Sequence, residues 1–298
     1  MRIVRCALAV ISNLRGVSDT FVLGGDLEVK RLGFGSMRLT GTGIWGEPAD
    51  PAACRDLLRH VVERDVNLID TADSYGPEVA EDLIAEALRP YPEDVVIATK
   101  GGLERPGPNR WVPNCRPERL RRCCEASLKR LRLERIDLYQ LHTVDPKVPI
   151  EDSIGALVEL QEEGKIRHIG VSNVGLEDLE RAQQIATIAS VQNRYNLVDR
   201  ASEEVLQECE RQQLAFLPWA PIASGRDLAG HGAAVDEIAR AHGTTPRQVA
   251  LAWLLRHSPV MLPIPGTSSI PHFDENAEAA QLELDDDELQ ALDEVAPA

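Results

Sequence analysis

The sequence lacks three features that would each indicate a particular class of protein. It contains no stretch approaching the roughly 18 consecutive apolar residues of a membrane-spanning helix. Its six cysteines show neither C-x-x-C spacing nor the paired Cys and His pattern of a zinc site, so we expect no metal. It also lacks a surplus of basic residues, and the net charge of -16 disfavours nucleic acid and anionic membrane surfaces as partners.

The rest of the composition is that of a globular protein. With 43% hydrophobic and 27% charged residues the chain can bury a large core, and its 298 residues suit one barrel of about 250 residues with additions. The cysteines favour free thiols in a reducing, cytoplasmic compartment. Residues 1–19 begin with a basic, apolar stretch but contain no small-residue cleavage site, so we interpret them as a loose extension before a single domain over 20–298.

Short apolar runs alternate with amphipathic stretches, which predicts a parallel sheet flanked by helices. Eight runs are strand candidates, the number that closes an α/β fold of the (β/α)8 (TIM) barrel type; a doubly wound open sheet is the alternative. Two further short runs around Gly24 and Gly25 predict an N-terminal β-hairpin over 21–29 that caps one end. The eight candidates are Leu32–Gly35, Val66–Ile69, Val95–Thr99, Ile136–Leu141, Ile166–Val171, Ile188–Val191, Leu214–Leu217 and Val260–Ile264.

Prolines mark the beginnings of several intervening helices. Pro51, Pro117, Pro246 and Pro271 each stand where a first helical turn is expected, a position that tolerates the missing N–H. Gly164 reads as a helix C-cap directly before a strand. Three connections are longer than usual, and long loops in compact domains are often functional. These connections run over 41–48, 101–114 and 223–232.

Polar residues end several of the predicted strands. In a closed parallel barrel the active site lies at the carboxyl ends of the strands, so Asp70, Lys100 and His142 should meet there, with Tyr75 five residues after Asp70. Each residue has a structural alternative: a helix cap for the aspartate, a salt bridge for the lysine, a hydrogen-bonded core residue for the histidine. The combination of all four favours a catalytic site.

The four side chains form a candidate proton-transfer set. A tyrosine hydroxyl has an ordinary pKa near 10, and an adjacent ammonium such as that of Lys100 lowers the pKa by stabilising the phenolate. Asp70 would hold Lys100 charged and oriented, while His142 would donate a hydrogen bond to a substrate carbonyl beside Tyr75. The pattern therefore predicts an enzyme that exchanges a proton with a carbonyl oxygen.

Three segments surround the four candidate residues: Ile69-Asp70-Thr71-Ala72-Asp73-Ser74-Tyr75-Gly76, Ile97-Ala98-Thr99-Lys100 and Leu138-Tyr139-Gln140-Leu141-His142. Further along the chain stand Ile169-Gly170-Val171-Ser172-Asn173, Val191-Gln192-Asn193-Arg194-Tyr195-Asn196 and Pro263-Ile264-Pro265-Gly266-Thr267-Ser268, followed by Glu275-Asn276. Together these segments resemble the aldo-keto reductase family over roughly residues 21–295, and bacterial members that include pyridoxal reductases in particular. The resemblance implies hydride transfer between NADPH, or NADH, and the carbonyl of a small aldehyde or ketone.

The resemblance also implies a set of cofactor-binding residues without a Rossmann domain, and Gly33-Phe34-Gly35-Ser36-Met37-Arg38 indeed lacks the third glycine of the dinucleotide fingerprint. Ser172, Asn173 and Gln192 would bind the nicotinamide carboxamide, and Tyr195 would stack on the ring. The loop before the helix at Pro271 would bind a phosphate through backbone N–H groups. The full set is Ser36, Met37, Asp70, Ser172, Asn173, Gln192, Tyr195, Trp219, Pro221, Ile222, Ser224, Gly266, Thr267, Ser268, His272, and, at the adenine end, Glu275 and Asn276.

Two departures from the family pattern concern the grip on the cofactor. Many relatives have a basic residue where this chain has Gly266 and an arginine where it has His272, so the hold on a 2′-phosphate should be weaker. The segment from Trp219 to Gly225 stands where relatives more often have a Tyr-Ser-Pro-Leu-Gly pattern. NADPH is therefore expected, with NADH possible.

For the substrate, Trp45 and Trp111 would form apolar walls beside Tyr75 and His142, although either indole could instead anchor its own loop. An aromatic or medium-sized aldehyde suits such walls, and pyridoxal is one candidate.

Two other classes of function are alternatives to the reductase: a cofactor-sensing binding module resembling potassium-channel β subunits, and a Schiff-base aldolase that uses Lys100. The sequence leaves both a monomer and a homo-oligomer open.

Overall fold

The computed structural model describes residues 19–222 and 232–296. The predicted extension over 1–19 lies outside this range except for its last residue, and so does Ser224. Among the described residues, no helix is both long enough and apolar enough to span a bilayer.

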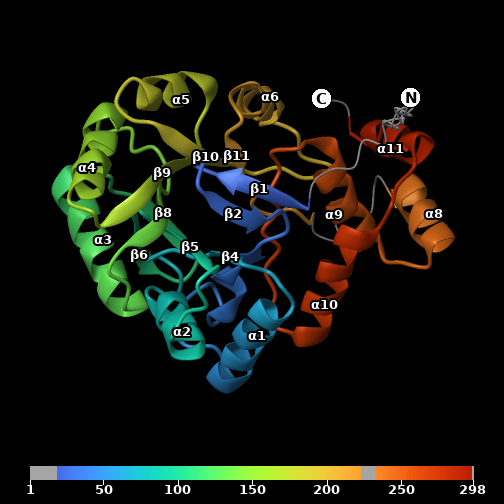
Figure 1. The fold of residues 1–298 in the computed structure, drawn as a ribbon, viewed down its shortest axis with the longest axis horizontal. Helices are drawn as coiled ribbons and strands as arrows, with labels where there is room; N and C mark the ends of the chain where they lie inside the picture. The colour runs from blue at the N-terminus through green and yellow to red at the C-terminus, as the bar shows by residue number, and fades with distance from the viewer. Residues whose placement is uncertain (1–18, 223–231, 297–298) are drawn as a thin grey trace, which may run out of the picture.

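A curled, wholly parallel sheet forms the centre of the molecule, and helices surround it (Figure 1). Seven of the eight predicted strands are regular and occur in the order β11-β10-β9-β8-β5-β4-β3, which follows the chain. The prediction of a (β/α)8 barrel is therefore confirmed. The strands are β3 (Phe34–Gly35), β4 (Leu68–Asp70), β5 (Val96–Gly101), β8 (Ile136–Leu141), β9 (Ile166–Ser172), β10 (Ile188–Gln192) and β11 (Ala215–Phe216).

The eighth predicted strand, Val260–Ile264, is an extended segment without a regular ladder, yet it closes the ring. On one side Leu262 N donates to Phe216 O of β11 at 2.8 Å. On the other side Gly33 N donates to Pro263 O at 2.9 Å and Gly35 N to Pro265 O at 3.2 Å. Because prolines have no N–H, this segment can accept from the first strand but cannot donate from those positions. The two prolines explain why the strand is irregular.

Ten helices cover the described part of the barrel. Those preceded or opened by prolines begin as predicted: Pro51, Pro117 and Pro246 are first residues, and α10 begins at Ile270 next to Pro271. The helices are α1 (Pro51–Glu63), α2 (Val79–Leu88), α3 (Pro117–Leu131), α4 (Ile150–Glu162), α5 (Leu176–Gln183), α6 (Glu203–Gln212), α8 (Gly232–His242), α9 (Pro246–His257), α10 (Ile270–Glu278) and α11 (Asp286–Asp293).

The predicted N-terminal hairpin is present as β1 (Thr20–Leu23) and β2 (Leu27–Lys30), and it lies across one mouth of the ring (Figure 1). Its Leu23, Leu27 and Val29 are buried in one cluster with Leu68 and Val96, which begin their strands. The hairpin therefore closes the amino ends of the strands, and the opposite mouth stays available for a site.

The connection over 101–114, expected as a loop, contains a second hairpin. Its strands are β6 (Leu103–Gly107) and β7 (Arg110–Pro113), paired antiparallel with a register shift. Prolines at 106 and 113 interrupt the alternating pattern that would have revealed the strands, and Asn109 at φ 55° makes the turn. The hairpin gives the Arg105 and Trp111 side chains a fixed base.

The turn of the N-terminal hairpin provides a test of this packing. Gly24 and Gly25 both have positive φ, at 64° and 88°, but only Gly24 faces another group. A Cβ at Gly24 would overlap the His168 imidazole, whereas a Cβ at Gly25 would meet nothing within 4 Å. We expect Gly24→Ala to lower the free energy of unfolding by about 1–3 kcal/mol more than Gly25→Ala, measured by chemical denaturation. Equal losses would show that His168 does not pack on the turn.

Candidate active site

The catalytic candidates lie on the inward-facing side of successive strands. Side chains alternate along a strand, so Leu68 and Asp70 point to the same face, as do Ala98 and Lys100. Leu68 and Ala98 belong to the cluster that fills the barrel beneath the hairpin. One step further along each strand the inward positions become polar, at the mouth opposite the hairpin. These positions are Asp70, Lys100, Gln140, His142, Ser172 and Gln192.

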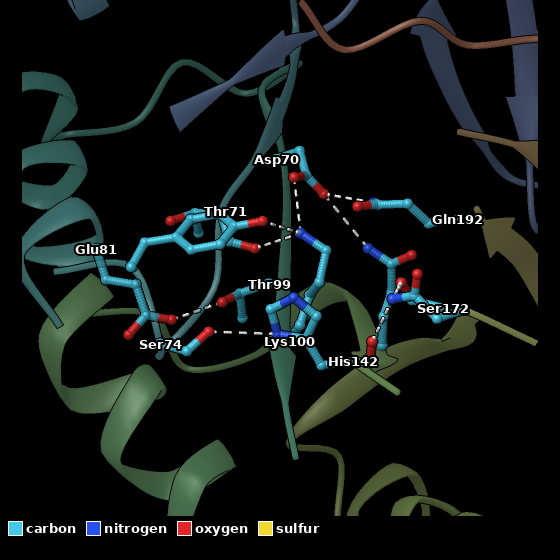
Figure 2. A network of polar contacts seen from close by, with 12 residues as sticks. Asp70, Thr71, Ser74, Glu81, Thr99, Lys100, His142, Ser172 and Gln192 are labelled. Atoms are coloured by element: carbon cyan, nitrogen blue, oxygen red, sulfur yellow. Dashed lines mark hydrogen bonds and ion pairs between the residues drawn. The ribbon is translucent and has the colours of Figure 1, made fainter. Parts of the chain in front are cut away.

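A buried ion pair stands at the centre of this layer. Lys100 Nζ donates to Asp70 Oδ2 at 2.7 Å and to the carbonyl oxygen of Thr71 at 2.8 Å, as Figure 2 shows. The other Asp70 oxygen accepts from Gln192 Nε2 at 2.8 Å and lies 3.5 Å from Gln140 Nε2. The Lys100 and Asp70 side chains are only 0% and 3% exposed. Burial alone would lower the pKa of the Lys100 ammonium, but the interactions with Asp70 and Tyr75 exceed this effect, so the pKa of Lys100 is raised.

Tyr75 lies on the loop after β4, next to the Asp70–Lys100 ion pair. Its hydroxyl lies 3.5 Å from Lys100 Nζ, and the side chain is 6% exposed. Burial raises the pKa of Tyr75, and the opposing effect of Lys100 is smaller. The sequence prediction of a net lowered tyrosine pKa is therefore wrong, because burial of the ring outweighs the ammonium. At neutral pH Tyr75 keeps its proton and can act as an acid.

His142 lies directly after β8 and faces the Tyr75 ring edge-on, with ring centroids 5.9 Å apart. Its Nδ1 is 3.3 Å from Ser74 Oγ, and this contact is drawn in Figure 2. Burial, Lys100 and Arg105 hold the pKa of His142 well below its usual value, so the imidazole is neutral at physiological pH. In the tautomer that carries its proton on Nε2, Nδ1 accepts from Ser74 and Nε2 is free to donate.

A cavity of about 540 Å³ opens onto these residues. Asp70, Tyr75 and His142 line it together with several of the expected cofactor residues, and Ile44 and Leu103 add apolar walls. The predicted residues that line it are Met37, Trp111, Ser172, Asn173, Gln192, Trp219, Pro221, Ile222 and Gly266. The geometry thus brings the predicted proton-transfer set to one edge of the cavity.

Tyr195 is not part of this cavity. Its ring is fully buried against Trp253, at 6.2 Å and 7° between ring planes, and its hydroxyl donates to Glu203 and lies 2.9 Å from His257 Nε2. The structure therefore contradicts the expectation that Tyr195 stacks on the cofactor ring, since its side chain packs outward against α9. Trp219 lines the cavity instead, and its indole N–H donates to Asn173 Oδ1 at 3.0 Å.

Other predicted residues lie outside the cavity lining. Glu275 accepts from Thr245 Oγ1 at 2.7 Å, and Trp45 lies on its loop beside Gly76. Ser36, directly after β3, is fully buried. Thr267 and Asn276 are buried, whereas Ser268 and His272 are exposed.

Sequence reasoning missed three residues that support the site. Gln140, two positions before His142 on β8, could have been found from the strand period, because it shares the inward face. Ser74 contacts the imidazole from a loop, and no spacing rule places it there. Arg38 lines the cavity and is the only Lys or Arg among the described residues that do so.

Comparison with known proteins defines the class to which this geometry belongs. Residues 31–297 match the model of the aldo/keto reductase family. An uncharacterized oxidoreductase of Schizosaccharomyces pombe is 49% identical over 270 residues, which cover 91% of this chain and 88% of the relative. Pyridoxine 4-dehydrogenase of Escherichia coli is 39% identical over 285 residues, which cover 94% of this chain and 99% of that relative.

Solved structures agree with the sequence comparisons. An aldo/keto reductase from Klebsiella pneumoniae in complex with NADP and acetate superposes with a TM-score of 0.81 at 30% identity, covering 94% of this chain and 96% of that one. Glycerol dehydrogenase from Gluconobacter oxydans superposes with a TM-score of 0.81 at 29% identity, covering 93% of this chain and 94% of that one. The chain belongs to the aldo/keto reductase family. It is an NAD(P)H-dependent oxidoreductase, as the resemblance implied.

The ion pair makes a stability test possible. Asp70→Asn leaves the buried Lys100 ammonium without its counter-ion, and we expect a loss of about 3–5 kcal/mol in the free energy of unfolding. The double variant Asp70→Asn with Lys100→Met removes both charges and should recover a large part of the loss. As a control, Glu125→Gln in the half-exposed Glu125–Lys165 pair at the surface should cost less than about 1 kcal/mol.

Chemical denaturation at pH 7 measures all three variants. If Asp70→Asn cost no more than the exposed control, the Lys100 ammonium would not depend on Asp70, and the electrostatic description of the site would be wrong.

Proposed function

We propose that this protein reduces the carbonyl group of a small aldehyde or ketone to the alcohol, with NADPH as the hydride donor and Tyr75 as the proton donor. One observation carries the proposal: a protonated tyrosine hydroxyl, a neutral histidine and a buried ammonium converge on one edge of an apolar-walled cavity. A carbonyl oxygen placed there would meet two hydrogen-bond donors. That arrangement matches the charge that develops when a carbonyl is reduced.

The cavity offers groups that suit a nicotinamide cofactor. Trp219 presents an exposed aromatic face, and Ser172 and Gln192 present polar atoms for a carboxamide. Gln192 Nε2 is already engaged with Asp70, which leaves its Oε1 to accept from an amide. Elsewhere in the cavity lining, the backbone of Gly266 packs closely against that of Gly35. A Cβ at Gly266 would lie 2.7 Å from Gly35 O and 3.5 Å from Arg38 Cγ, so the Arg38 side chain lies next to Gly266. Arg38 is thus placed to meet a phosphate.

Held by residues such as Ser172, Gln192 and Trp219, a reduced nicotinamide would supply a hydride to the carbonyl carbon. His142 Nε2 donates a hydrogen bond to the carbonyl oxygen and orients it, while Ser74 holds the imidazole from behind. As negative charge grows on that oxygen, the Tyr75 O–H bond breaks and its proton completes the alcohol. Lys100 stabilises the phenolate left on Tyr75, and Asp70 keeps Lys100 charged and pointed at it.

The same charges disfavour a Schiff-base role for Lys100. A lysine must lose its proton before its nitrogen can attack a carbonyl, yet Asp70 and Tyr75 raise the pKa of this ammonium. Its donors are directed at Asp70 and at the Thr71 carbonyl. We therefore assign Lys100 to charge stabilisation.

The walls favour a planar, aromatic carbonyl compound, and pyridoxal is a specific candidate. Trp111 lies edge-on to both Tyr75 and His142, with centroids 6.3 Å away in each case, so its ring flanks the carbonyl position. The relative from Escherichia coli is named for the oxidation of pyridoxine, the alcohol that corresponds to pyridoxal. A substrate panel with NADPH should therefore include pyridoxal, benzaldehyde derivatives and short aliphatic aldehydes.

The acid role of Tyr75 gives a direct prediction. Tyr75→Phe removes the hydroxyl and keeps the ring that packs against Trp111 and His142. We expect kcat for aldehyde reduction to fall by at least about a hundredfold, the lower end of what general acid catalysis contributes. The dissociation constant for NADPH, measured by fluorescence quenching, should change by less than about twofold. A variant that reduces aldehydes at the wild-type rate would remove Tyr75 from this role.

Arg38 gives a second prediction, on cofactor preference. A charge-assisted hydrogen bond contributes about 1.5–3 kcal/mol, so Arg38→Ala should weaken NADPH binding by about tenfold or more. The additional phosphate distinguishes NADPH from NADH, and we expect NADH binding to weaken much less. Arg89→Ala, an exposed arginine outside the cavity lining, is the matched control. Equal weakening of both cofactors would place Arg38 on a shared phosphate, and no weakening would exclude it from the cofactor site.

A further inference from the structure

One arginine outside the catalytic cavity contacts three of the loops that shape it. Arg105, on β6, donates from Nη1 to the Ser74 carbonyl at 2.7 Å and from Nη2 to the Gly43 carbonyl at 3.0 Å. Its Nε donates to the Arg110 carbonyl at 3.0 Å. The guanidinium carbon also lies 3.6 Å from the centroid of the Trp111 ring.

These contacts lead to residues that face the substrate position. Ser74 carries the hydroxyl that lies 3.3 Å from His142 Nδ1. Gly43 precedes Ile44, and both Ile44 and Trp111 line the cavity. A single planar group therefore connects the loop of Ser74, whose hydroxyl contacts His142, with the loop of Ile44 and the hairpin of Trp111.

Ion pairing does not account for this placement. Within 19–222 and 232–296, no Asp or Glu lies within ion-pair distance of the Arg105 guanidinium. Its hydrogen-bond acceptors are three backbone carbonyls, and its face rests on an indole. A rigid, five-donor guanidinium can bind carbonyls in fixed directions and stack at the same time, which a lysine ammonium cannot do.

The Arg105 charge also acts on the neighbouring imidazole. The charged and titratable groups around His142 are Lys100, Arg105 and the Tyr75 hydroxyl, from β5, β6 and the loop after β4. Both cations lower the pKa of His142, and burial is the largest cause. Loss of the Arg105 charge alone should raise that pKa, since one of the two repelling cations disappears.

We propose that Arg105 is a positioning residue that fixes Trp111 and the Ser74–His142 pair so that the cavity accepts a planar aromatic carbonyl compound. The inference rests on the proposed reductase function. It assigns substrate selection to a side chain that does not line the catalytic cavity and does not touch the reacting atoms.

The test compares Arg105→Met, which removes the charge and the donors, with Arg105→Lys, which keeps the charge but cannot reach two carbonyls and stack. Arg110→Met, an exposed side chain on the same hairpin, is the control. In both Arg105 variants we expect KM for benzaldehyde to rise about tenfold, while KM for propionaldehyde changes by less than about threefold. The dissociation constant for NADPH should be unchanged, and Arg110→Met should behave as wild type.

A second measurement separates the charge from the positioning and requires no turnover. NMR titration of the histidine ring protons should give a higher His142 pKa in Arg105→Met than in wild type. In Arg105→Lys it should stay near the wild-type value, although KM for benzaldehyde rises there too. A merely structural role would not produce this division between the two variants.

Three results would contradict a positioning role for Arg105. An unchanged KM for benzaldehyde in Arg105→Met, an equal rise for both aldehydes, or a parallel loss of NADPH binding would overturn the proposal. If wild-type protein reduced no carbonyl compound while binding NADPH, the reductase proposal would fail, and the NMR titration would still report whether Arg105 acts on His142.

Discussion

A fully buried lysine ammonium has to be compensated, and in this protein that requirement organises the candidate active site. Lys100 is 0% exposed and is held by Asp70 at 2.7 Å and by the Thr71 carbonyl. An unpaired charge in this position would cost several kcal/mol, so the pair ties β4 to β5 at the mouth of the barrel. Gln192 extends the connection across the barrel to β10 by donating to the second Asp70 oxygen. The ammonium is thereby kept charged at the place where a phenolate would form.

The two ends of the barrel differ in composition: one is closed by apolar packing, and the other carries the polar side chains of the candidate site. The hairpin of β1 and β2 closes the amino ends of the strands with apolar side chains, which frees the other mouth for polar ones. The loops at that mouth are not independent of one another, because Arg105 binds the Ser74 and Gly43 carbonyls and stacks on Trp111. A reaction that transfers a hydride and a proton to one carbonyl needs both partners fixed at once, and a rigid site reduces the cost of that alignment.

Much of this arrangement could be predicted from the sequence because strands have a period of two and barrels place chemistry at strand ends. That reasoning placed Asp70, Lys100 and His142 at one mouth of the barrel, and the structure brings the three side chains together there. It failed where local geometry after a strand decides the direction of a side chain. Tyr195 packs outward against Trp253, and Trp219 lines the cavity instead, although both follow predicted strands. The sign of the Tyr75 pKa shift also depended on burial, which the sequence does not quantify.

The most direct test of the account is the pH dependence of single-turnover aldehyde reduction by the NADPH-saturated enzyme. If a protonated Tyr75 with a raised pKa is the acid, the rate should stay constant from about pH 6 to about pH 9 and fall only above that range. Oxidation of the corresponding alcohol should increase over the same upper range, since it needs the phenolate. A reduction rate that fell between about pH 6 and pH 8 would contradict the account. It would indicate that a group titrating near neutrality, and not Tyr75, is the acid.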